Sequence, residues 1–137
     1  MSQDVVKGFY DKLISDTSAG SFRTLLSNRI FEVEGPTEGA FPHAIFQVVA
    51  TPYEDTFDSS SLKDYIFQVD IYGRKRLGMT AVGAINTALF SLLDRQTITI
   101  PNNDPGLVRC VTEGVRTVEN DAVRIRSEWL VQTGSFN

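Results

Sequence analysis

Cysteine and histidine each occur only once in this sequence of 137 residues. The single cysteine, Cys110, excludes an internal disulfide and a zinc site built from cysteines. Any Ser-His-Asp or Cys-His catalytic arrangement would need His43, and the sequence has no Gly-x-Ser-x-Gly turn to hold a nucleophile. We therefore expect no catalytic residues. His43 is predicted to be a surface residue at the start of a strand, and Cys110 a small buried side chain.

Long apolar runs and an excess of positive charge are also missing. No uncharged apolar run approaches the ~18 residues of a membrane-spanning helix, and residues 1–4 (MSQD) lack the basic-then-apolar order of a signal peptide. Thirteen Lys and Arg against 17 Asp and Glu give a formal net charge of −4, which argues against binding to nucleic-acid phosphates. No glycine-rich phosphate loop is present. We expect a protein without cofactor, metal or membrane contact that folds in a reducing cytoplasm.

The overall composition is that of an ordinary globular domain. Hydrophobic residues make up 42% of the chain and charged residues 22%, and 10 Gly and 5 Pro are too few for a collagen-like or low-complexity chain. A chain of this length buries roughly 70% of the surface that its unfolded form exposes. One apolar core is therefore sufficient for stability, and we predict a single domain over residues 1–137.

The spacing of apolar residues predicts the secondary structure. Two main helices are expected at 4–15 and 77–94, with a short helix at 21–28. Strands are expected at 30–33, 44–51, 65–72, 97–100, 107–118 and 122–133. Because helices and strands are grouped rather than strictly alternating, we predict an α+β fold: an antiparallel sheet with two main helices packed on one face, plus a C-terminal β-hairpin. The order of the strands is left open by these patterns.

Acidic residues gather between two of the predicted strands. Residues 53–64 contain three consecutive serines together with Glu54, Asp55, Asp58 and Asp64. Carboxylates at short spacing are Ca²⁺ ligands in some proteins, but this spacing does not match an EF-hand and has no central glycine. We predict a mobile, solvated loop that becomes ordered against a neighbouring molecule.

Charged side chains alternate with apolar ones along the predicted hairpin. Two interpretations are open: an exposed sheet face stabilised by cross-strand pairs worth about 0.2–1 kcal/mol each, or a contact between subunits that covers a long edge strand. The basic triplet at 74–76 is interpreted as a solvated flank of the following helix or as an interchain salt bridge, which is favoured over a contact with DNA phosphates. The candidate residues for a subunit or tube interface are Arg74, Arg76, Arg109, Arg116, Arg124, Arg126 and Glu128. Reversing the charges of Arg124 and Arg126 is expected to weaken assembly and to leave a folded monomer.

The order of the segments resembles the tail terminator or tail-completion proteins of long-tailed phages, which are minor tail proteins. The resemblance covers nearly the whole chain and depends on the ordered set of segments rather than on any one of them. These segments are LLSNRIF at 25–31, FPHAIF at 41–46, YIFQVDIY at 65–72, ALFSLL at 88–93 and the closing hairpin.

The resemblance implies a structural virion protein that is not an enzyme. Such a protein assembles as a ring, typically a homo-hexamer, on the head-proximal end of the tail tube, ends tube growth and presents a surface for head-to-tail joining. Its implied partners are its own copies, the tail tube protein and the head-completion or connector protein, and DNA would pass through the lumen without specific binding. Assembly would take place in the host cytoplasm. A head-completion protein, another minor tail protein or, in a different class, a small-ligand-binding α+β domain is the alternative.

Overall fold

The computed structural model describes residues 2–33, 41–50, 64–74, 78–101, 105–119 and 122–133. Its elements confirm the predicted α+β class. Along the chain they are α1 (Ser2–Leu13), α2 (Phe22–Leu25), β1 (Ile30–Glu32), β2 (His43–Ala50), β3 (Asp64–Arg74), α3 (Gly78–Leu93), β4 (Thr97–Ile98), β5 (Gly106–Glu119) and β6 (Ala122–Gln132).

The six strands form one sheet in the order β1-β2-β3-β6-β5-β4. All neighbouring strands are antiparallel except β1 and β2, which are parallel. The sheet is therefore mixed rather than purely antiparallel, because β1 and β2 begin at the same end of the sheet. The predicted hairpin is present as β5 and β6, which pair from Leu107 and Gln132 to Glu119 and Ala122.

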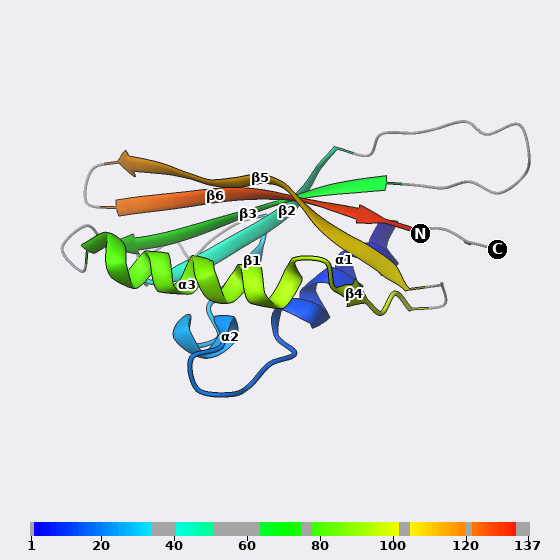
Figure 1. Cartoon of the computed structure of the whole chain (residues 1–137), viewed down its shortest axis with the longest axis horizontal. Helices are drawn as coiled ribbons and strands as arrows, with labels where there is room; N and C mark the ends of the chain where they lie inside the picture. The colour runs from blue at the N-terminus through cyan, green and yellow to red at the C-terminus, as the bar shows by residue number, and fades with distance from the viewer. Residues whose placement is uncertain are drawn as a thin grey trace, which may run out of the picture.

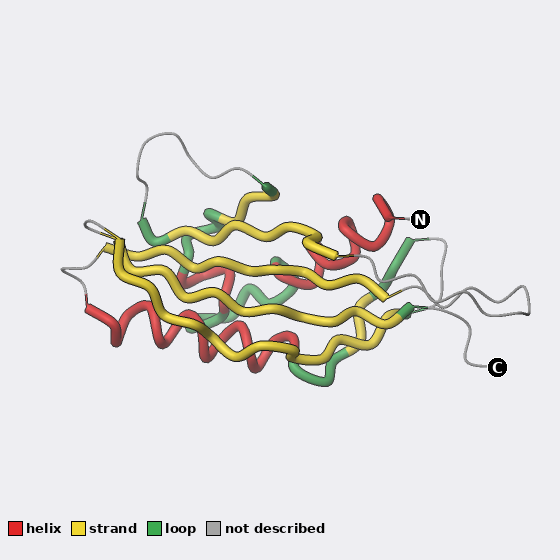
Figure 2. Tube along the Cα trace, turned by 90° about the horizontal axis from the view of Figure 1, so that it is seen from above, coloured by secondary structure: helices red, strands yellow, loops and turns green. Residues whose placement is uncertain are grey.

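All three helices lie on one side of the sheet, with α3 running beneath its strands (Figure 1). Seen from above, the strands lie in front of the helices, so the other side of the sheet faces the viewer (Figure 2). The core fills the space between the two layers. The rings of Phe9 in α1 and Phe67 in β3 stack with centroids 4.1 Å apart, and Phe90 of α3 meets the fully buried Trp129 of β6 edge to face at 4.8 Å.

Helix α1 has the amphipathic pattern that the sequence predicts. Val5, Phe9 and Leu13 recur every four residues and are fully buried, while Lys7 and Asp11 form an ion pair at 2.9 Å on the exposed side. Gly8 allows a close approach, since a Cβ at this position would lie 2.5 Å from the backbone oxygen of Thr99. Two segments distant in sequence are thereby packed backbone to backbone.

Two predicted boundaries are wrong. Strand β4 ends at Ile98 rather than at residue 100, because the chain at 99–100 packs beside Gly8 of α1 instead of pairing in the sheet. Asp64 was expected in the mobile acidic loop, but it is the first residue of β3 and lies opposite Gln132 of β6. The other members of that loop, Glu54, Asp55 and Asp58, lie outside the described residues.

Candidate functional site

The side of the sheet that faces away from the helices, here called the open face, is covered by no described element (Figure 2). At its centre a polar network links β3 and β6. Asp70 and Arg126 lie directly opposite each other, and the Arg126 guanidinium donates to the Asp70 carboxylate at 2.8 and 3.4 Å. The Gln68 amide donates to the same carboxylate at 2.9 Å. Asp70 is only 5% exposed, so these donors replace the water that a carboxylate otherwise needs.

The network has a clear electrostatic consequence. Hydrogen bonding to Asp70 raises the pKa of Arg126 above its ordinary value, against the smaller opposing effect of burial. Arg126 therefore remains positively charged, and its partner Asp70 lies on the neighbouring strand β3. Arg126 thus makes a cross-strand contact within the sheet, which is one of the two interpretations that the sequence left open.

His43 was predicted to be a surface residue, and this prediction is wrong, since its exposure is only 7%. It is the first residue of β2 and lies opposite Tyr72 of β3, on which its ring stacks at 5.0 Å with an interplanar angle of 17°. Phe41 covers it at 5.2 Å, and the Arg74 guanidinium lies 5.7 Å from the centre of the Phe41 ring. An aromatic cluster thus occupies the end of the open face, where the sequence indicated an isolated histidine.

The predicted arginines of strand β5 do not share one face. Arg109 lies opposite Leu130, and Arg116 lies opposite Ile125, whose side chain is buried in the core on the helix side. Paired residues on antiparallel strands point to the same side, so Arg109 belongs to the open face and Arg116 to the other side. Simple alternation over the seven residues that separate the two arginines already places them on opposite sides. The two irregularities in β5, between Cys110 and Thr112 and between Thr112 and Val115, together leave this relation unchanged.

The remaining predicted residues are distributed as follows. Arg124 and Glu128 are half-buried on the open face with Arg126, and the exposed Arg74 at the end of β3 lies opposite Ala122. Arg76 lies outside the described residues. Cys110 is partly buried and packs against the core. Burial raises the pKa of its thiol, and the negative charges of Asp94 and Glu113 raise it further, so it remains in the less reactive protonated form.

Six large hydrophobic side chains are exposed among the described residues, and they lie toward opposite edges of the sheet. Three belong to β5: Val111, Val115 and Val118 are 52%, 53% and 56% exposed. On the outer side of this strand, the chain at 95–98 forms hydrogen bonds or pairs only as far as Val108. Within the described part of the chain, residues 109–118 therefore have no strand on their outer side. We call this segment the β5 edge.

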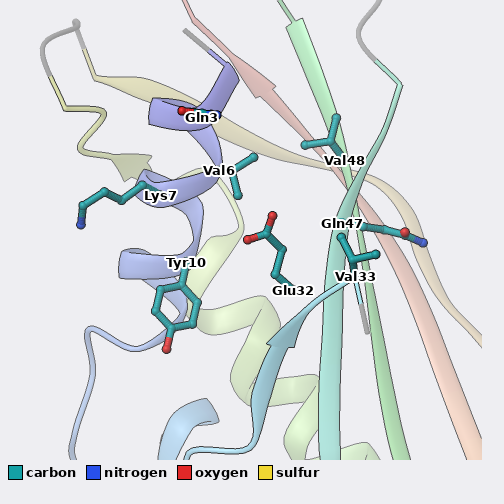
Figure 3. A pocket seen from close by; sticks show the side chains of 8 residues that line it. All are labelled: Gln3, Val6, Lys7, Tyr10, Glu32, Val33, Gln47 and Val48. Atoms are coloured by element: carbon teal, nitrogen blue, oxygen red, sulfur yellow. The ribbon is translucent and has the colours of Figure 1, made fainter. Parts of the chain in front are cut away.

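The other three exposed hydrophobic residues are Tyr10, Val33 and Val49, at 37%, 59% and 43%. Tyr10 and Val33 line an open groove of about 680 Å³ between α1 and the strands β1 and β2, together with Gln3, Val6, Lys7, Glu32, Gln47 and Val48. Figure 3 shows the Glu32 carboxylate pointing into this groove and Lys7 pointing away from it. We call this feature the α1–β2 groove.

The groove has a structural origin at the end of β1. The last register pair of β1 and β2 joins Glu32 to Phe46, and the Val33 N–H then donates to the Phe46 oxygen. Val33 has a φ of +67°, a conformation that a β-branched residue rarely adopts, and the strand ends there. Strand β2 continues to Ala50, so the described structure leaves its outer edge beyond Phe46 facing the groove.

The described residues offer neither a metal site nor a membrane-spanning helix. No group of three or more His, Cys, Asp and Glu side chains within them is placed to hold a metal ion. In the same part of the chain, no helix has the length and apolar character needed to span a membrane.

The fold is shared with solved structures at low sequence identity. No family model and no curated protein matches the sequence. A chain from the virion of a native gene transfer agent particle superposes with a TM-score of 0.73 and 13% identity, over 94% of this chain and 93% of that chain. A second solved structure superposes with a TM-score of 0.68 and 16% identity, over 100% of this chain and 98% of the other. At these identities, the likeness establishes the fold.

Sequence reasoning missed both the Asp70 network and the two groups of exposed hydrophobic side chains. A signal for the network is present: Asp70 and Gln68 are the polar residues in the middle of a mostly apolar strand, and a carboxylate there needs a donor from a neighbouring strand. The two patches have no such signal, because residues that belong to opposite edges of the sheet are recognised only when the strand order is known.

Proposed function

We propose that this chain is a structural protein of a phage-like virion, and within it a tail terminator that forms a ring on the head-proximal end of the tail tube. The observation that carries this proposal is the fold, which matches a chain of a gene transfer agent virion over nearly the full length of both chains. The order of sequence segments, which resembles tail terminators, supports the finer role. A ring, expected to be a hexamer, would end tube growth and present a joining surface to the head.

The described surface suits such a role. A closed ring of identical subunits needs two different patches on each subunit that fit each other, and two exposed apolar patches lie toward opposite edges of the sheet. The proposed partners are other copies of the chain, the tail tube protein and the head-completion or connector protein. The net charge of −4 favours a lumen through which DNA slides without specific binding.

The proposal is tested by removing the gene from the phage or particle that encodes it. We expect headless particles with tails of irregular length in negative-stain images, and correct tails when the gene is restored. Purified protein added to isolated tubes should bind as rings at one end only. Tails of normal length joined to heads in the absence of the gene would contradict the proposal.

A further inference from the structure

We propose that copies of this chain associate head to tail, with the β5 edge of one copy seated in the α1–β2 groove of the next. This contact rests on the proposed ring and specifies how its subunits meet. The first argument is the distribution of exposed hydrophobic residues. Among the described residues they form two groups of three, one toward each edge of the same sheet, so a contact between the two edges covers residues of both groups.

The second argument is the backbone. A free strand edge presents unpaired N–H and C=O groups and tends to pair with another chain. Residues 109–118 form such an edge over roughly 30 Å, at about 3.4 Å per residue. Among the described residues, no strand pairs with the outer edge of β2 beyond Phe46, and Gln47 and Val48 line the groove there. Pairing of the two would extend the sheet from one copy to the next and satisfy both rows of groups.

The third argument is charge. Glu32 projects its carboxylate into the groove (Figure 3), and its neighbour Val33 is the most exposed apolar side chain there. On the β5 edge, the exposed Arg116 follows Val115 in the chain and points to the helix side of the sheet, because it lies opposite the buried Ile125. Glu32 lies opposite the buried Phe46 and points to the same side. The two segments therefore present charges of opposite sign on one side of the sheet. Lys7, the cation of the groove wall, is already paired with Asp11.

The contact is tested with cysteines placed in the two patches. Val33→Cys and Val115→Cys are prepared as separate full-length proteins, each with Cys110→Ser to remove the native thiol, and are mixed under oxidising conditions. We expect a disulfide between the two variants in the mixture and little dimer from either variant alone. A third protein with Ser91→Cys, an exposed position on α3, serves as the control and should form no link with either.

The charge pair gives a second readout. Glu32→Arg or Arg116→Glu alone should lower the yield of self-association by about tenfold, because like charges would meet, and the double variant should recover it. Cross-links only between two copies of Val115→Cys would show a two-fold β5 contact and overturn the proposal, as would the absence of any link between the two variants.

These outcomes are separable from those of the tail terminator proposal. If rings cap the tubes but no disulfide forms between Val33→Cys and Val115→Cys, the tail terminator proposal is supported and the proposed contact is refuted. If the disulfide forms but tails are normal in the absence of the gene, the contact is supported and the tail terminator proposal is refuted.

Discussion

Replacing Arg126 with methionine should destabilise the folded protein, although the sequence also makes this residue a candidate for an interface. The substitution keeps most of the apolar stem and removes both hydrogen bonds to the buried Asp70 carboxylate. Breaking a fully buried ion pair costs about 3–5 kcal/mol, and a hydrogen bond to a charged group about 1.5–3 kcal/mol. The Arg126 side chain is 38% exposed, so water reaches the site and the lower range applies.

We therefore expect Arg126→Met to lower the free energy of unfolding by about 1.5–3 kcal/mol, measured by urea denaturation followed by circular dichroism. With an m-value near 2 kcal/mol/M, the midpoint should fall by about 1 M. The matched control is Arg109→Met, an exposed arginine on the same face, which should change stability by less than about 0.5 kcal/mol.

A double-mutant cycle isolates the pair. Asp70→Asn removes the charge that Arg126 compensates, so adding Arg126→Met to it should cost less than Arg126→Met alone, with a coupling of about 1 kcal/mol or more. Equal losses for Arg126→Met and Arg109→Met would refute the assigned role of the network. For the same reason, charge reversal of Arg126 would place a carboxylate against Asp70 and destabilise the sheet.

Three further outcomes are expected. Gly8→Ala should destabilise by about 1–2 kcal/mol, because the new methyl group would meet the Thr99 backbone oxygen at 2.5 Å. Its control, Gly83→Ala in α3, has open space around it and should instead stabilise by about 0.5–1 kcal/mol; equal signs in thermal denaturation would contradict this packing. Trp129→Leu should cost about 2–4 kcal/mol of unfolding free energy through a core cavity, and a loss below 1 kcal/mol would argue against its burial. Alkylation of Cys110 by iodoacetamide should begin at a higher pH in the folded than in the urea-unfolded protein, because burial raises the thiol pKa above its ordinary 9.0. This group then stabilises the fold below that pH and loses its contribution as the pH rises through the folded value; coincident profiles would refute the shift.

Local patterns were sufficient for the elements of this protein. The four-residue recurrence of Val5, Phe9 and Leu13 identifies α1, and the alternation along 122–133 identifies β6 and its buried face, because both periods reflect backbone geometry within a few residues. The α+β class followed from the order of these elements. The resemblance to phage tail proteins likewise came from an ordered set of short segments.

Contacts between distant segments were decided only by the tertiary structure. The parallel pairing of β1 with β2, the strand order and the two irregularities in β5 depend on which strands become neighbours. So do the burial of His43 against Tyr72 and the Asp70–Arg126 pair, whose members are 56 residues apart in sequence. A residue's own neighbours in the chain determine its local conformation, whereas its partner across the sheet depends on the free energy of the whole core.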